Sequence, residues 1–122
     1  MTSELTNDAI ALLSEMIKIE SFSREEHKVA GCLESYIESK GYVAARNGNN
    51  IWLMSPGFDP LRKTILLNSH IDTVKPVAGW IKDPFSPLIE NDKLYGLGSN
   101  DAGASVVTLL QTFFYLTQRQ QS

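Results

Sequence analysis

The chain has 122 residues, a formal net charge of −3, 43% hydrophobic residues and a single cysteine, Cys32. This length supports one hydrophobic core and argues against several domains. The negative charge and the scattered lysines and arginines argue against a nucleic-acid partner, and a single cysteine excludes an internal disulfide. The chain has no apolar run long enough for a membrane span and no export signal, so we expect a cytoplasmic protein without a membrane partner.

Two helices are predicted in the first third of the chain. The first begins near residues 6–8, and apolar residues recur along it at helical spacing: Ile10, Leu13, Met16 and Ile17. The second is predicted to begin with a capping box, in which Ser23 is the N-cap and Glu26 lies three residues later, and to end at Gly41. Its buried face is expected to carry Ala30, Leu33 and Ile37, with Cys32 as a small core residue.

The middle of the chain predicts β-structure. Asn47-Gly48-Asn49 is a hairpin turn signal between short strands at residues 42–45 and 51–54. After a loop at residues 56–60, residues 64–69, with Ile65-Leu66-Leu67 at their centre, are predicted to form the most buried strand.

The last third of the chain predicts a second hairpin and a long helix. Asn91-Asp92 is a turn signal between strands at residues 88–90 and 93–95, and the helix follows over residues 102–117. The side chains expected to face the core from this helix are Val106, Leu109, Leu110, Phe113 and Leu116. This order of elements predicts an α/β fold, with a mixed β-sheet flanked by helices.

The predicted central strand leads directly into a histidine and an aspartate, in the run Leu66-Leu67-Asn68-Ser69-His70-Ile71-Asp72-Thr73-Val74. Side chains two positions apart on a strand point to the same side, and ligands bind at the C-terminal ends of strands in open α/β sheets. An aspartate beside a histidine is the usual support of a metal-bound imidazole. The alternative is an ordinary hydrogen-bonded pair without a metal.

A second acidic residue, Asp101, ends the segment Gly96-Leu97-Gly98-Ser99-Asn100-Asp101, immediately before the last helix. Simple N-capping of that helix is one interpretation of an aspartate at this position. The two glycines indicate a tight turn or a close approach to another part of the molecule. If Asp101 lies near His70, the two side chains offer the mixed nitrogen and oxygen ligands that zinc accepts.

These two segments, in this order and at this spacing, resemble the zinc-dependent aminoacylase and carboxypeptidase family. That family includes acetylornithine deacetylase, succinyl-diaminopimelate desuccinylase, glutamate carboxypeptidase and the tripeptidases, and the Trp80-Ile81-Lys82-Asp83-Pro84-Phe85 connection also resembles it. The resemblance implies that His70 binds one zinc ion and that Asp101 bridges two, with cobalt as an alternative metal. It also implies a catalytic role for Asp72, which orients His70, and a cis peptide bond between Asp101 and Ala102.

The chain departs from the family pattern and lacks part of the family's site. It has Ala102-Gly103-Ala104 where many members have Met-Lys-Gly, and Leu97 where arginine is common. In the family, a Glu-Glu pair, a further acidic or histidine ligand and a final histidine lie downstream of these motifs, and residues 102–122 contain none of them. His27 is expected to be a solvated or partly packed helix residue. We therefore expect residues 1–122 to be the N-terminal part of a catalytic domain, inactive alone and only a weak binder of zinc.

The resemblance implies a hydrolase that removes the acyl group from a small N-acyl amino acid. The expected form is an acetylornithine deacetylase-like enzyme of arginine biosynthesis. A carboxypeptidase or dipeptidase acting on a short peptide is one alternative, and a non-catalytic interaction domain is another. An incomplete sheet would leave an apolar edge and face uncovered, so self-association of the chain is also expected.

Overall fold

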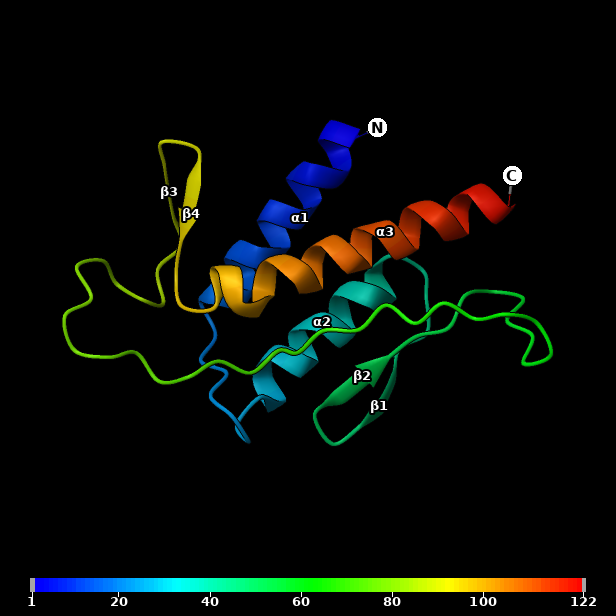
Figure 1. Cartoon of the computed structure of the whole chain (residues 1–122), viewed down its shortest axis with the longest axis horizontal. Helices are drawn as coiled ribbons and strands as arrows, with labels where there is room; N and C mark the ends of the chain where they lie inside the picture. Colours follow the sequence, from blue (N-terminus) through cyan, green and yellow to red (C-terminus); the bar gives the residue numbers. More distant parts are fainter. Residues whose placement is uncertain (1, 122) are drawn as a thin grey trace.

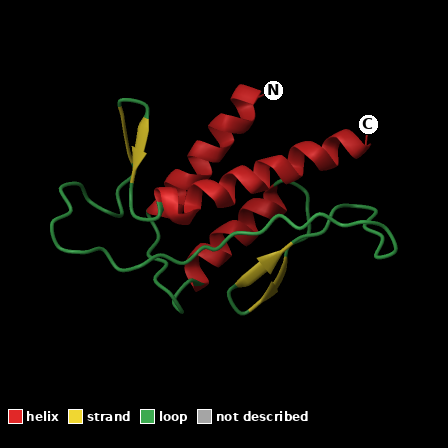
Figure 2. Cartoon of the chain, in the orientation of Figure 1, coloured by secondary structure: helices red, strands yellow, loops and turns green. Residues whose placement is uncertain are grey.

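The computed structural model describes residues 2–121, and it describes the side chains of residues 3–119. Over this range the chain forms three α-helices and two separate antiparallel hairpins (Figure 1, Figure 2). The elements in chain order are α1 (Thr2–Ile17), α2 (His27–Ser39), β1 (Ala45–Asn47), β2 (Asn50–Trp52), β3 (Leu88–Glu90), β4 (Lys93–Tyr95) and α3 (Ala104–Gln121), with a π-helical turn, η1 (Ser99–Gly103), directly before α3.

The core lies where the three helices meet (Figure 1). Its buried apolar side chains are Leu12, Leu13, Met16, Ile17, Val29, Leu33, Val106 and Val107. The predicted burial of Ala30 and Ile37 is also confirmed. One expectation is wrong: Leu116, predicted to face the core, is 48% exposed. Leu116 is exposed because it lies on the outer face of α3, whereas the next residue, Thr117, is 3% exposed and its hydroxyl lies 2.6 Å from that of Tyr42.

The start of α2 differs from the predicted capping box. Glu26 is the N-cap residue, without a side-chain capping hydrogen bond, and Ser23 lies outside the helix. The prediction is wrong because Arg24 adopts a φ of +73°, which turns the chain before the helix begins. The predicted end of α2 is confirmed: the helix stops at Ser39, and Gly41 has a φ of +88°.

Both hairpins form at the predicted turns. Arg46 pairs with Ile51 across the first hairpin, and Ile89 pairs with Leu94 across the second. Asn91 and Asp92 have φ values of +52° and +60°. Two successive positive φ values are typical of the two-residue type I′ turn, whose twist matches that of the paired strands.

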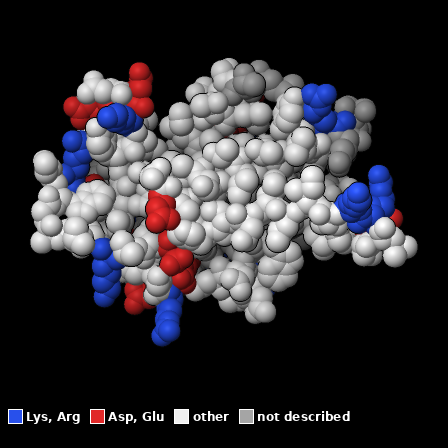
Figure 3. Space-filling model, in the orientation of Figure 1, with Lys and Arg blue, Asp and Glu red and all other residues white. Residues whose placement is uncertain are grey.

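The predicted central strand does not form. Residues 64–69 are extended but pair with no strand in the described part of the chain, and Ile65 and Leu66 are 85% and 82% exposed. A strand needs a neighbour to satisfy its backbone groups, and the two hairpins lie on opposite sides of the helices (Figure 2). The expected mixed sheet is therefore replaced by two separate two-stranded sheets. Figure 3 shows a broad area with few charged side chains over the middle of this face.

None of the described helices combines the length and the apolar character needed to cross a membrane.

Candidate functional site

The segment that carries His70 and Asp72 is held against the connection between α1 and α2. The backbone N–H of Thr73 donates to the oxygen of Ser21 at 2.8 Å, and the N–H of Ser23 donates to the oxygen of Thr73 at 3.2 Å. Ile71, between the two polar residues, packs against the hydrophobic core. Because neighbouring side chains of an extended segment point to opposite sides, burial of Ile71 directs His70 and Asp72 outward.

Asp101 is brought to the same place by the turn η1. Gly98 has a φ of +78°, and a Cβ atom at this position would lie 2.5 Å from Cγ2 of Thr73. Glycine therefore allows the turn to approach the Asp72 segment closely, as the sequence indicated. The expected cis peptide bond between Asp101 and Ala102 is confirmed.

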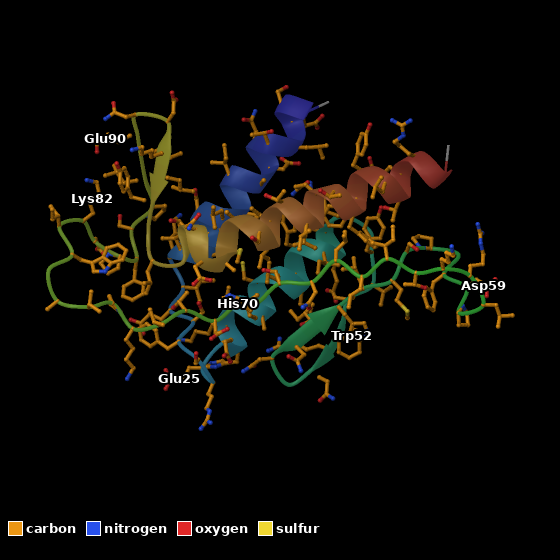
Figure 4. The ribbon with its side chains drawn as sticks, viewed as in Figure 1. Glu25, Trp52, Asp59, His70, Lys82 and Glu90 are labelled. Atoms are coloured by element: carbon orange, nitrogen blue, oxygen red, sulfur yellow. The ribbon has the colours of Figure 1, made fainter. Side chains whose placement is uncertain are left out.

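The structure brings the three predicted site residues together, with His70 near the start of α3 (Figure 4). His70 Nε2 lies 3.0 Å from Asp101 Oδ1. On the other side of the ring, His70 Nδ1 lies 3.2 Å from both Oδ1 and the backbone oxygen of Asp72. The side chains of His70 and Asp101 are 53% and 86% exposed, so the site is open to solvent.

Sequence reasoning missed one residue of this cluster, Ser23. Its hydroxyl donates to Asp72 Oδ2 at 2.5 Å. This hydrogen bond is the largest cause that holds the pKa of the Asp72 carboxyl below its usual value of 3.8, and the charge of His70 acts in the same direction. No local pattern predicts this contact, because the two residues are 49 positions apart.

The arrangement places an acceptor opposite each nitrogen of the imidazole ring. A neutral imidazole has a single N–H donor, and an ionised carboxylate can only accept. If Nδ1–H donates to Asp72, the lone pair of Nε2 faces a carboxylate oxygen of Asp101. A cation between Nε2 and Oδ1 would remove this conflict, as would a second proton on the ring.

The donor set fits zinc, but only in part. Imidazole nitrogen and carboxylate oxygen are both zinc ligands, with bonds of about 2.0–2.2 Å, so a tetrahedral ion holds two such atoms about 3.3–3.5 Å apart. His70 Nε2 and Asp101 Oδ1 are 3.0 Å apart, so a shared ion requires the two side chains to separate by about 0.3–0.5 Å. Within the described residues, no group of three or more His, Cys, Asp or Glu side chains is placed to hold a metal. The second histidine, His27, is exposed on α2, as expected, and its backbone oxygen accepts a hydrogen bond from Arg46 Nη2 at 3.1 Å.

The family model described as peptidase family M20/M25/M40 matches residues 66–122 of the chain. The matched region begins just before His70 and includes Asp72, Asp101 and α3. The three side chains that converge in the structure therefore all lie in the part of the chain that carries the family pattern.

Relatives extend the similarity to most of the chain. The chain is 28% identical over 113 residues to a succinyl-diaminopimelate desuccinylase from Blochmanniella floridana, which covers 87% of the chain and 29% of the relative. It is 32% identical over 119 residues to the enzyme of the same name from Methylococcus capsulatus, and the match covers 88% of the chain and 30% of that relative. It is 37% identical over 107 residues to a peptidase M20 domain-containing protein from Schizosaccharomyces pombe, and the match covers 82% of the chain and 25% of that relative. The chain thus spans between 25% and 30% of the length of these relatives.

Proposed function

The chain belongs to peptidase family M20/M25/M40, a family of metal-dependent hydrolases, and from this premise we propose that it supplies part of a zinc site for amide-bond hydrolysis. In this proposal residues 1–122 are part of a catalytic domain of a longer polypeptide. The other metal ligands and the general base come from outside these residues.

The observation that carries the proposal is the contact between His70 Nε2 and Asp101 Oδ1 at 3.0 Å. The two residues are 31 positions apart and come from unrelated elements, an extended segment and the turn before α3. When His70 Nδ1–H donates to Asp72, Nε2 and Oδ1 each present an electron pair to the other, which favours a shared cation. The contact therefore supports roles for His70 and Asp101 as metal ligands.

Asp72 would act through His70 rather than on the substrate. By accepting the Nδ1 proton, its carboxylate keeps the Nε2 lone pair free and directed toward Asp101. The negative charge of Asp72 also makes the imidazole a better electron donor. When bound, zinc acidifies a water molecule and polarises the carbonyl of the scissile amide.

The proposed substrate is a small N-acyl amino acid. Two of the relatives above are named for removing a succinyl group from a diaminopimelate compound, and none of the three is named for ornithine. These names favour a succinylated diamino acid over the acetylated ornithine of arginine biosynthesis that the sequence led us to expect.

A peptide substrate is the second candidate. The relative with the highest identity of the three, at 37%, carries a peptidase domain in its name, and the family itself is described as a peptidase family. The bond is an amide in both cases, so the same metal chemistry serves either substrate.

The proposal is tested by assaying the full-length protein, supplied with zinc or cobalt, against N-succinyl-diaminopimelate, N-acetylornithine and dipeptides. We expect the succinylated substrate to be hydrolysed fastest and Asp101→Ala to abolish turnover, because a ligand to the metal is lost. Ser39→Ala, at the far end of α2, is the control and should retain full activity. Undiminished turnover by Asp101→Ala would refute the proposed role of this residue.

A further inference from the structure

We propose that Ser23 is a positioning residue of the metal site, because its hydroxyl fixes one oxygen of Asp72 so that the other oxygen meets the imidazole of His70. This inference rests on the proposed function, since positioning has a purpose only if His70 is a ligand. Nothing in the family pattern at residues 66–122 covers Ser23, which precedes it by more than forty positions.

The first support is the geometry of the contacts around Asp72. Ser23 Oγ donates to Oδ2 at 2.5 Å, and Oδ1 lies 3.2 Å from His70 Nδ1. The carboxylate is therefore held at both oxygens and cannot rotate without losing a partner. His70 in turn keeps Nε2 opposite Asp101.

The second support is that Ser23 is itself held firmly in place. Its backbone N–H donates to Thr73, and Thr73 donates to Ser21, so residues 21–23 lie alongside the Asp72 segment as a short parallel bridge. On its other side, the backbone N–H of Arg24 donates to Glu26 Oε1 at 2.6 Å. The turn that presents Ser23 is thus fixed by groups that do not touch the metal ligands.

The third support is the contact of this turn with the first hairpin. Asn49 Nδ2 donates to Glu26 Oε2 at 2.9 Å, so Glu26 links the hairpin turn to the turn that carries Ser23. A series of polar contacts, with the peptide bond between Ser23 and Arg24 as one link, then joins Asn49 to Asp101. The series passes through Glu26, the Arg24 backbone, Ser23, Asp72 and His70.

The test uses the full chain and compares Ser23→Ala with Ser23→Thr, which keeps the hydroxyl. The matched control is Ser39→Ala, which removes another exposed serine hydroxyl with one hydrogen bond, of 2.6 Å to the Tyr36 oxygen. Two quantities are measured: the zinc dissociation constant, and the position of the ring proton of His70 in the metal-free chain. The second comes from two-bond ¹H–¹⁵N NMR spectra at about pH 8, where an unperturbed imidazole is neutral.

We expect the proton of His70 to reside on Nδ1 in the original chain and in Ser23→Thr, and to shift toward Nε2 in Ser23→Ala. Loss of a direct partner of a metal-bound histidine costs about 10- to 100-fold in metal affinity. Ser23 is one contact further away, so we expect Ser23→Ala to weaken zinc binding by about three- to tenfold. Ser39→Ala should change neither quantity. If Ser23→Ala does not fold, Ser23→Val is compared with Ser23→Thr, because the two differ only by a methyl group in place of the hydroxyl.

The outcomes separate this inference from the proposed function. An unchanged proton position and unchanged zinc affinity in Ser23→Ala, with zinc affinity lost in His70→Ala, would overturn the role of Ser23 and leave the metal site standing. Zinc affinity that survives His70→Ala would overturn the proposed function instead. In that case the proton position in Ser23→Ala still decides whether Ser23 positions the ring through Asp72.

Discussion

Asp72 connects the parts of the candidate site at the scale of single residues. Its two carboxylate oxygens contact Ser23 and His70, and its backbone oxygen also faces the imidazole. The pairing of His70 with Asp72 follows from their spacing along an extended segment. The part played by Ser23 does not, because it depends on how the connection between α1 and α2 lies across a segment 49 residues away.

Glu26 gives a prediction on pH dependence at this scale. The hydrogen bond from the Arg24 backbone, with a further one from Asn49, holds the pKa of the Glu26 carboxyl below its usual value of 4.5. The ionised carboxylate therefore stabilises the folded state above pH 4.5, and this contribution is lost as the pH falls through the lowered folded-state value. We expect Glu26→Gln to lower the free energy of unfolding at pH 7 by about 0.5–1.5 kcal/mol. Below pH 4.5, the free energy of unfolding should fall less steeply with pH in this variant than in the original chain.

Urea unfolding followed by circular dichroism between pH 3 and pH 7 checks this prediction. The control is Glu25→Gln, which removes the same charge from the exposed neighbouring position. Equal acid dependence in the original chain and in Glu26→Gln would show that this carboxylate does not stabilise the fold through its charge.

The turn before α3 is the element that determines where Asp101 lies. Gly103 is buried in this turn, and a Cβ atom there would lie 2.6 Å from Leu13 Cδ1 and 2.7 Å from the backbone oxygen of Gly98. Neither neighbour can give way freely, because one is a core side chain and the other is backbone. The absence of a side chain at this position thus lets α1 support the turn that presents Asp101.

We expect Gly103→Ala to destabilise the protein by about 1–3 kcal/mol, the usual cost of overpacking a buried site. The matched control is Gly31→Ala in α2, where a Cβ atom would lie 3.7 Å from Arg46 Nη1, an ordinary contact. Alanine is the better helix former, so Gly31→Ala should stabilise the chain by about 0.5–1 kcal/mol. Thermal unfolding measures both changes, and a neutral or stabilising Gly103→Ala would contradict the packing described for this turn.

The elements divide into those that local sequence determines and those that it does not. The hairpin turns at Gly48 and at Asn91-Asp92 were predictable because a turn depends on the conformations of its own residues. The helices were predictable from their apolar spacing, although α1 begins at Thr2, earlier than expected. The strand at residues 64–69 was not, because a strand exists only with a partner, and the pattern of residues 64–69 does not reveal whether one lies beside it.

At the scale of the whole molecule, the main feature is the exposed apolar segment at residues 64–69. Ile65 and Leu66 are almost fully exposed, and Val74 and Val77 beyond His70 are 75% and 72% exposed. An extended segment with unpaired backbone groups and apolar side chains is a template for pairing with another chain.

We therefore expect the chain, when studied alone, to self-associate through this segment. Leu66→Lys should shift the chain toward monomer at a given concentration, because a charge opposes burial of the segment. The control is Thr112→Lys, which adds the same charge on the exposed side of α3. Sedimentation velocity over a range of concentrations distinguishes the variants, and a strictly monomeric original chain would rule out this form of association.

The central claim, that His70 and Asp101 share one cation, is tested most directly by zinc titration calorimetry on the full chain and three variants: His70→Ala, Asp101→Ala and the double variant. We predict weak binding of zinc by the original chain, since the described residues supply only two ligands. Each single variant should lose this zinc binding. The double variant should bind zinc no more weakly than either single variant, because both side chains act on the same ion. Zinc binding of equal strength in the original chain and in both single variants would contradict the claim.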